Sequence, residues 1–167
     1  LMQLMSLQSE IRDPSSPRPI PGTGAGVELT GVTFHYPSRP AQAALQGIDL
    51  HVRPGEHVAL VGPSGAGKTT LFQLLLRFYD PQQGSIRVNG VELRDARLHD
   101  LRGKIGIVPQ DSVIFGASAL ENIRYGRADA SDAEVVDAAK AAAAHDFIER
   151  LPERYQTFLG EKGVRLS

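Results

Sequence analysis

The sequence contains no cysteine, and this absence excludes several kinds of chemistry at once. Without cysteine there is no disulfide framework, no thiolate-bound metal and no cysteine nucleophile. An excess of charge of one sign is also lacking, because 18 Lys and Arg face 19 Asp and Glu, for a net charge of −1. Together with only 6% aromatic residues, this balance argues against a dedicated nucleic-acid-binding protein, which would show a basic face.

Long apolar runs are missing as well. No stretch of 18 or more apolar residues occurs, so we expect no membrane-spanning helix in this sequence, and no secretory signal opens it. The 167 residues suffice for one domain with a hydrophobic core. The first residue is Leu1 rather than Met, and no helix stop or loop signal precedes the final Leu166-Ser167, so we expect a piece of a longer protein.

What the sequence does contain is a phosphate-loop pattern, Gly62-x-x-x-x-Gly67-Lys68-Thr69. The short apolar run 58–61 before it predicts a strand buried on both faces of a parallel sheet. Apolar residues then recur at the i, i+3, i+4, i+7 spacing of an amphipathic helix; they are Leu71, Leu74, Leu75 and Phe78. The alternative is a glycine-rich turn that opens an ordinary helix, but the order strand, loop, helix favours a phosphate site.

The residue types of this loop suit the binding of a phosphate chain. Glycine lets the backbone approach an anion closely, and the N–H groups of the loop and of the helix N-terminus are expected to point at phosphate oxygens. We expect Lys68 to reach the β- and γ-phosphates, Thr69 to bind Mg²⁺ through its hydroxyl, and Thr70 to donate a hydrogen bond near the α-phosphate. The predicted nucleotide-binding residues of this stretch are Gly62, Pro63, Ser64, Gly65, Ala66, Gly67, Lys68, Thr69 and Thr70.

The segments that flank the phosphate loop are expected to form strands, hairpins and one short helix. Residues 14–26 are rich in proline and glycine and predict an extended linker. A strand with a bulge at Gly31 is expected in 27–36, and Asn89-Gly90 predicts a type I′ hairpin turn. The remaining expected elements here are a strand through residues 48–52, a short helix in 98–101 and a buried strand in 105–108.

From residue 112 onward the sequence predicts helices. Two Ser-x-x-Glu capping boxes, Ser118 with Glu121 and Ser131 with Glu134, each open a helix, and the second of these helices is expected to run to about Ala144. A further short helix is expected in 146–151, and residues 155–163 are expected to form a loop.

Four motifs in this order resemble those of the nucleotide-binding domain of an ATP-binding cassette (ABC) transporter of the exporter type. The likeness runs from about Val27 to Ser167. Its motifs are an aromatic loop in 34–40, the phosphate loop, a glutamine loop in 108–111, and an exporter-specific loop in 160–167. The resemblance implies that Tyr36 stacks on adenine, with Arg39 in the same binding loop. It also implies that Gln110 binds Mg²⁺ and senses the γ-phosphate, so that Lys68 and Gln110 are the catalytic residues and Thr69 and Gln110 the metal ligands.

The resemblance also implies an α/β fold: a P-loop NTPase core with an antiparallel β-subdomain and a truncated helical subdomain. We expect residues 1–13 to follow an upstream membrane domain, 14–26 to be the linker, 27–111 to form the ATP-binding core, and 112–167 to form the incomplete helical subdomain. The family's signature motif would begin at Leu166-Ser167, and its catalytic glutamate would lie further on. The fragment alone is therefore expected to bind nucleotide at most.

For the full-length protein, the resemblance implies ATP-driven export of a lipid, a drug or a peptide. Its cofactors would be ATP and Mg²⁺. Its partners would be a second nucleotide-binding domain, which sandwiches ATP, and a transmembrane domain, with no nucleic acid. The domain would lie at the cytoplasmic face of an inner or plasma membrane. The alternatives are a soluble P-loop NTPase, such as a kinase or GTPase, and a non-transport ABC protein of DNA repair or translation.

Overall fold

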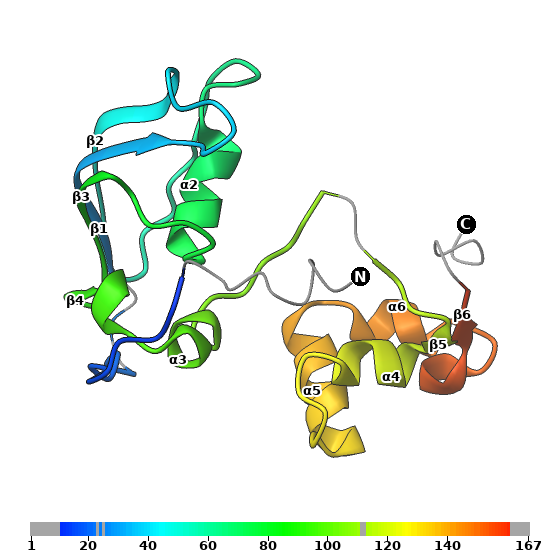
Figure 1. Ribbon diagram of the computed structural model, residues 1–167. Helices are drawn as coiled ribbons and strands as arrows, with labels where there is room; N and C mark the ends of the chain where they lie inside the picture. Colours follow the sequence, from blue (N-terminus) through cyan, green and yellow to red (C-terminus); the bar gives the residue numbers. More distant parts are fainter. Residues whose placement is uncertain (1–10, 23, 25, 111–112, 161–167) are drawn as a thin grey trace, which may run out of the picture. The chain divides into compact units, whose positions relative to one another are not determined.

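The structure is a computed structural model that describes residues 11–22, 24, 26–110 and 113–160. Its helices and strands fall into two compact units, Leu1–Ile107 and Val108–Ser167 (Figure 1). The first unit contains β1 (Val27–His35), β2 (Ala43–Val52), α2 (Lys68–Leu75), β3 (Gln83–Val88), β4 (Val91–Glu92), the 3-10 turn η1 (Leu93–Asp95) and α3 (Leu98–Arg102). The second contains β5 (Ala117–Ser118), α4 (Ala119–Arg124), α5 (Asp132–Ala141), α6 (His145–Glu149), the 3-10 turn η2 (Arg154–Gln156) and β6 (Phe158–Leu159).

The first unit is built on an antiparallel sheet with the strand order β2-β1-β3-β4. The predicted bulge in β1 is confirmed, because the pairing with β2 shifts register between Leu29 and Val32 and Gly31 has a φ of 57°. The shift changes which alternate residues face inward. As a result Leu29 on one side of the bulge and Val32 and Phe34 on the other are all buried.

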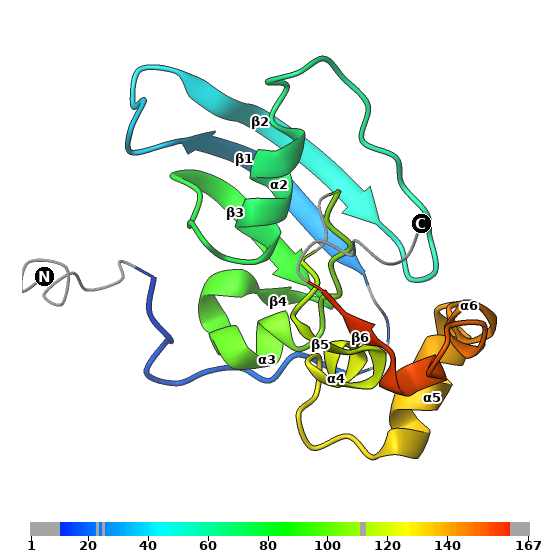
Figure 2. The same ribbon diagram turned by 90° about the vertical axis from the view of Figure 1, so that its right-hand side faces the viewer.

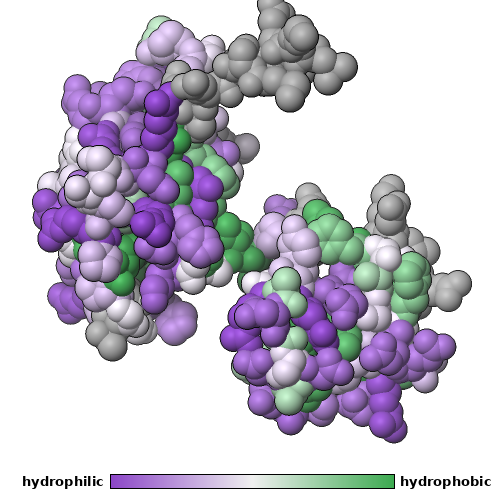
Figure 3. Space-filling view, turned by 60° about the horizontal axis from the view of Figure 1, so that its bottom comes forward, coloured by the Kyte–Doolittle hydropathy of each residue, from purple (hydrophilic) through white to green (hydrophobic). Residues whose placement is uncertain are grey.

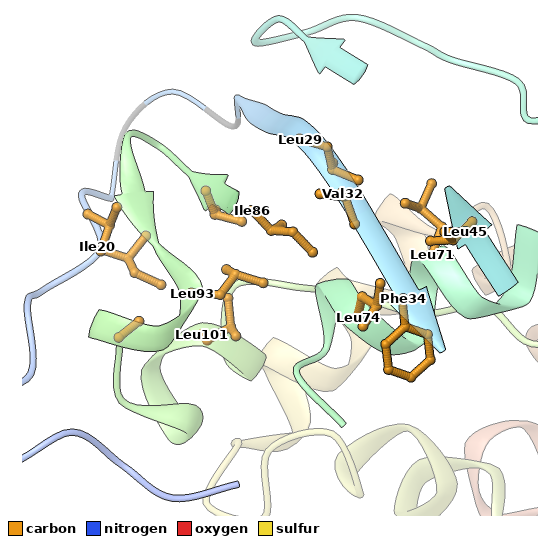
Figure 4. Packing of buried hydrophobic residues seen from close by; sticks show 13 residues of the cluster. Ile20, Leu29, Val32, Phe34, Leu45, Leu71, Leu74, Ile86, Leu93 and Leu101 are labelled. Atoms are coloured by element: carbon orange, nitrogen blue, oxygen red, sulfur yellow. The ribbon is translucent and has the colours of Figure 1, made fainter. Parts of the chain in front are cut away.

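Helix α2 covers one face of this sheet (Figure 2). Its Leu71 lies beside Leu45 of β2, and its Leu74 lies beside Phe34 of β1 (Figure 4). Leu74 is fully buried. The core then continues through β3, η1 and α3 to Leu101 and includes Ile20 from the segment before β1. The helix that carries the end of the phosphate loop is therefore anchored by its apolar face.

The predicted type I′ hairpin is confirmed at the β3–β4 turn. Asn89 and Gly90 have φ values of 50° and 76°, as both central residues of this turn require. The Asn89 side chain also accepts a hydrogen bond from the Gly26 N–H at 2.8 Å. The turn therefore fixes the point where the chain enters β1.

The segment from Ile11 to Gly26 is attached to the first unit at several points, although it forms no helix or strand where it is described. The buried guanidinium of Arg77, at the end of α2, donates from Nη2 to the carbonyl of Arg12 at 3.2 Å. The further attachments are the hydrogen bonds Leu98 N–H to Asp13 Oδ1, Arg18 N–H to Asp95 O and Asn89 Nδ2 to Pro21 O, and the buried side chain of Ile20.

Two expected strands are wrong. The runs 58–61 and 105–108 form no strand, and Val61 and Val108 are 88% and 95% exposed. A buried parallel strand needs hydrogen-bonded neighbours, and the pairings among the described residues are antiparallel and leave both runs unpaired. The helix predicted from the apolar spacing was also too long. Helix α2 ends at Leu75, and Phe78 lies beyond it, exposed and beneath the Arg102 guanidinium. On the face drawn in Figure 3, hydrophobic side chains lie between hydrophilic ones.

The second unit packs three helices around a small core that includes Leu120, Val135 and Ile148. Ser118 caps α4, as predicted, by accepting from the Glu121 N–H. Residues 158–159 were expected in a loop but form β6, which pairs with β5. The Tyr155 hydroxyl lies 2.9 Å from His145 Nδ1, and burial raises the pKa of Tyr155.

Ser131 and Glu134 form the complete capping box that was predicted at the start of α5. The Glu134 carboxylate accepts from the Ser131 N–H at 2.9 Å and from its hydroxyl at 2.8 Å, and it pairs with Arg127. These hydrogen bonds, first that from the Ser131 backbone, lower the pKa of Glu134 from 4.5 to about 2.

Because the pKa of Glu134 is lower in the folded protein, the stability that it contributes is complete above pH 4.5 and is lost as the pH falls toward 2. We expect Glu134→Gln to lower the thermal midpoint at pH 6 and to flatten its decline between pH 4.5 and 3. Thermal unfolding followed by circular dichroism over this range measures both effects. The control is Asp137→Asn, on the same helix and paired at 3.7 Å with Lys140. An unchanged pH profile in Glu134→Gln would refute the assignment.

Candidate nucleotide-binding site

The phosphate loop joins the run 58–61 to α2, and Gly67 is the N-cap of that helix. Gly67 has a φ of 83°, which a side chain rarely tolerates. A Cβ atom at this position would lie 2.6 Å from the Ala44 carbonyl oxygen and 2.6 Å from Leu45 Cδ2. Glycine at position 67 thus lets the loop turn into the helix while it lies directly against the start of β2.

Lys68 is the first residue of α2, and its ammonium group folds back over the loop. Nζ donates to the carbonyl oxygens of Gly62 and Pro63, each at 2.7 Å. An ammonium group has three N–H donors, so these two hydrogen bonds leave one donor to be directed at a ligand. The loop therefore holds a positive charge at a defined place.

The N-terminus of α2 carries no side-chain cap and no acidic residue in its first turn. The first N–H groups of a helix have no partner within the helix, and the helix dipole favours negative charge at this end. Together with Lys68, this end of the helix is suited to bind an anion.

The aromatic loop between β1 and β2 is held by two turns, in which Arg39 N–H donates to Tyr36 O and Gln42 N–H donates to Arg39 O. The Tyr36 ring meets the rings of Phe34 and Tyr79 edge-on, with centroids 5.0 and 5.5 Å apart. Its hydroxyl lies 2.9 Å from Thr70 Oγ1 on α2. The side chains of the loop and of the helix are therefore in direct contact.

The aromatic loop and the phosphate loop enclose one cleft of about 470 Å³. It is lined by Tyr36, Arg39, Gln42, Ala43, Ala44, Ser64, Gly65, Ala66, Gly67, Lys68, Thr69 and Thr70. Two of these residues, Arg39 and Lys68, are cationic and none is acidic. A cleft with an aromatic side chain, two cations and a helix N-terminus suits a phosphorylated ligand with a planar base.

The cleft brings together nine of the predicted site residues and leaves three outside its lining. Gly62 and Pro63 are linked to it through Lys68. Gln110 is exposed and belongs to the second unit. Sequence reasoning missed Gln42, Ala43 and Ala44, whose only signal was that they lie shortly after the predicted aromatic motif 34–40. Most of the predicted exporter-specific loop, residues 161–167, lies outside the described residues.

Thr70 is only 6% exposed, and its hydroxyl contacts Tyr36. Its expected hydrogen bond to the α-phosphate therefore stays a prediction that requires the hydroxyl to change partner.

Over the described ranges, no group of three or more His, Cys, Asp or Glu side chains could hold a metal ion. Within that same part of the chain, no helix has the length and apolar character needed to cross a membrane.

The phosphate-loop motif and the cleft beside it indicate a nucleotide-binding protein, and comparison with known proteins identifies its family. Residues 45–167 match the family model described as "ABC transporter". The chain is 47% identical over its whole length to "ABC transporter B family member 3" of Dictyostelium discoideum, of which it covers 12%. It is 43% identical, again over its whole length, to "ATP-binding cassette sub-family B member 6" of Mus musculus, of which it covers 20%.

A solved structure, "Structure of a bacterial Atm1-family ABC exporter with ATP bound", matches 99% of this chain with a TM-score of 0.89 and 43% identity. The chain covers 29% of that protein. The chain therefore belongs to the ABC transporter family, and its fold is that of the nucleotide-binding domain of an ABC exporter, a P-loop NTPase. It spans less than a third of the length of each of these proteins.

Proposed function

We propose that the full-length protein is an exporter driven by ATP, and that this chain supplies its nucleotide-binding surface. The observation that carries the proposal is that Tyr36 and Lys68 line the same cleft. An aromatic ring at one wall and an ammonium group with a helix N-terminus at the other match a nucleotide, which has a planar base and a charged phosphate chain. The fragment alone is proposed to bind nucleotide without turning it over.

In this proposal each part of the cleft has one role. The N–H groups of residues 64–69 and the Lys68 ammonium hold the phosphates, and Tyr36 and Arg39 hold the nucleoside end. Mg²⁺ would be held by Thr69 and Gln110 together with phosphate oxygens, as this ion is commonly bound in phosphate sites. Bound Mg²⁺ would neutralise charge on the phosphates during hydrolysis. Neutral oxygen ligands suit this arrangement, because the substrate itself supplies the negative charge.

The partners proposed are a second nucleotide-binding domain, which closes on ATP, and the transmembrane domain of the same transporter. The location proposed is the cytoplasmic face of the membrane. The Mus musculus relative is named as an ATP-binding cassette protein, and the similar solved structure is that of an exporter with ATP bound. Both likenesses support an ATP-binding part of a transporter. A soluble P-loop NTPase is less well supported, since the aromatic loop at Tyr36 and the exporter match both favour transport.

We expect Tyr36→Leu in the intact protein to weaken ATP binding about 5- to 150-fold, because base–aromatic stacking contributes about 1–3 kcal/mol. Binding of inorganic tripolyphosphate, which has no base, should change less than twofold. Isothermal titration calorimetry with both ligands measures the difference.

The matched control is Tyr79→Leu, which removes a ring of the same aromatic group that does not line the cleft. Tyr79 supports the Tyr36 ring but does not line the cleft, so this variant should weaken ATP binding less than Tyr36→Leu does. Equal losses for ATP and tripolyphosphate in Tyr36→Leu would show that this residue does not recognise the base.

A further inference from the structure

The Tyr36 hydroxyl is held by two side chains of α2. It donates to Gln73 Oε1 at 2.7 Å and lies 2.9 Å from Thr70 Oγ1. A phenol has one proton, and here that proton is directed to Gln73, so the Thr70 hydroxyl must be the donor in the second hydrogen bond. The hydrogen bonds thus run in one direction, from Thr70 to Tyr36 to Gln73.

This arrangement fixes the Tyr36 ring from two sides. Thr70 and Gln73 are three residues apart and therefore lie on one face of α2, toward the aromatic loop. At the other side, the ring is held edge-on by Phe34 and Tyr79. Thr70 is buried and Gln73 is half-buried, so these hydrogen bonds are partly shielded from competing water.

Gln73 does not line the cleft, whereas Tyr36 and Thr70 do. The Gln73 side-chain oxygen nevertheless accepts the hydrogen bond donated by the hydroxyl of Tyr36, whose ring forms the aromatic wall. We propose that Gln73 is a positioning residue, which orients Tyr36 for a nucleotide base and keeps it in register with the phosphate loop on the same helix. This inference rests on the proposed function, because it concerns how the same cleft recognises the base.

A purely structural role for Gln73 predicts a different result. If Gln73 only stabilised α2, its loss would disturb the phosphate loop and would weaken every ligand that contains phosphates. If it acts through Tyr36, its loss weakens only ligands with a base. A base-free probe therefore separates the two roles.

The test uses Gln73→Met, which keeps the length of the side chain and removes the acceptor, in the intact protein. We expect ATP binding to weaken about three- to tenfold and binding of inorganic tripolyphosphate to stay within twofold. Tyr36→Phe, which removes this hydrogen bond together with the one from Thr70, should weaken ATP binding at least as much and should again leave tripolyphosphate binding within twofold. The double variant should be no weaker than Tyr36→Phe alone, since residues that act through one bond are not additive.

Three results would overturn the inference: unchanged ATP binding in Gln73→Met, equal weakening of both ligands, or additive losses in the double variant. If Gln73→Met does not fold, Tyr36→Phe still tests the bond, because it leaves α2 intact. A wild-type protein that binds neither ligand would reject the proposed function itself. A wild-type protein that binds both, with Gln73→Met unaffected, would reject only the role of Gln73.

Discussion

Lys68→Ala is expected to lower the rate of ATP hydrolysis by the intact protein about 100- to 1,000-fold. In other enzymes, removing one preorganised donor that stabilises developing charge lowers the rate by a similar factor. The ammonium group is held at 2.7 Å from two loop carbonyls and keeps a third donor for the phosphates. Alanine removes both the positive charge and this placement. A phosphate-release assay in the presence of Mg²⁺ measures the loss.

Two control variants make this result specific. Lys68→Arg keeps the charge, but its planar guanidinium cannot occupy the same point between the Gly62 and Pro63 carbonyls, so we expect a loss of at least tenfold. Lys104→Ala removes an exposed lysine that does not line the cleft and should leave the rate within twofold. Hydrolysis by Lys68→Ala within tenfold of the wild-type rate would contradict the assignment of this loop.

Gly84→Ala is expected to destabilise the sheet of the first unit by about 2–5 kcal/mol. Gly84 has a φ of 81°, where a side chain costs about 1–2 kcal/mol. A Cβ atom there would also lie 2.4 Å from the Thr30 carbonyl oxygen and 2.5 Å from that of Gly31. These atoms are backbone at the bulge of β1, so they cannot move aside as a flexible side chain would, and overpacking adds about 1–3 kcal/mol.

Gly90→Ala is the matched control for this substitution. Gly90 lies in the turn that follows β3, with a similar φ of 76°, but a Cβ atom there would meet nothing within 4 Å. It should therefore cost only the conformational term of about 1–2 kcal/mol. Hydrogen exchange of the β1 and β3 amides in the intact protein compares the two variants. Equal acceleration of exchange in both would show that the contact with β1 does not matter.

The local elements of this fold could largely be predicted from the sequence, because their signals are local. Gly31 and Asn89-Gly90 marked a bulge and a turn through backbone conformations that few residues adopt. Ser131 and Glu134 marked a helix start, since both partners of the capping box lie within four residues. In each case one short segment contains both the signal and the physical cause.

Features that depend on distant residues could not be predicted in the same way. The runs 58–61 and 105–108 have the composition of buried strands, but composition does not supply a hydrogen-bonded neighbour. Gly84 is a further example, since the approach of the β1 bulge, more than 50 residues earlier in the chain, is what requires glycine there.

The residues of the candidate site also divide into those with a local sequence signal and those without one. The phosphate loop and Tyr36 are contained in motifs, and the cleft brings them together. Gln73, by contrast, gave no signal, because its importance lies in a hydrogen bond to a residue 37 positions away.

The attachment of the segment before β1 has a mechanical consequence. The bond between Arg12 and Arg77 joins residues 65 positions apart, and Asp13, Arg18 and Pro21 add further bonds along the way. Because hydrogen bonds hold this segment from Arg12 onward, it cannot absorb a displacement by straightening. A displacement of the chain before Arg12 would therefore be transmitted to Arg77, just after the C-terminal end of α2, before it reached β1. Lys68 lies at the opposite end of the same helix.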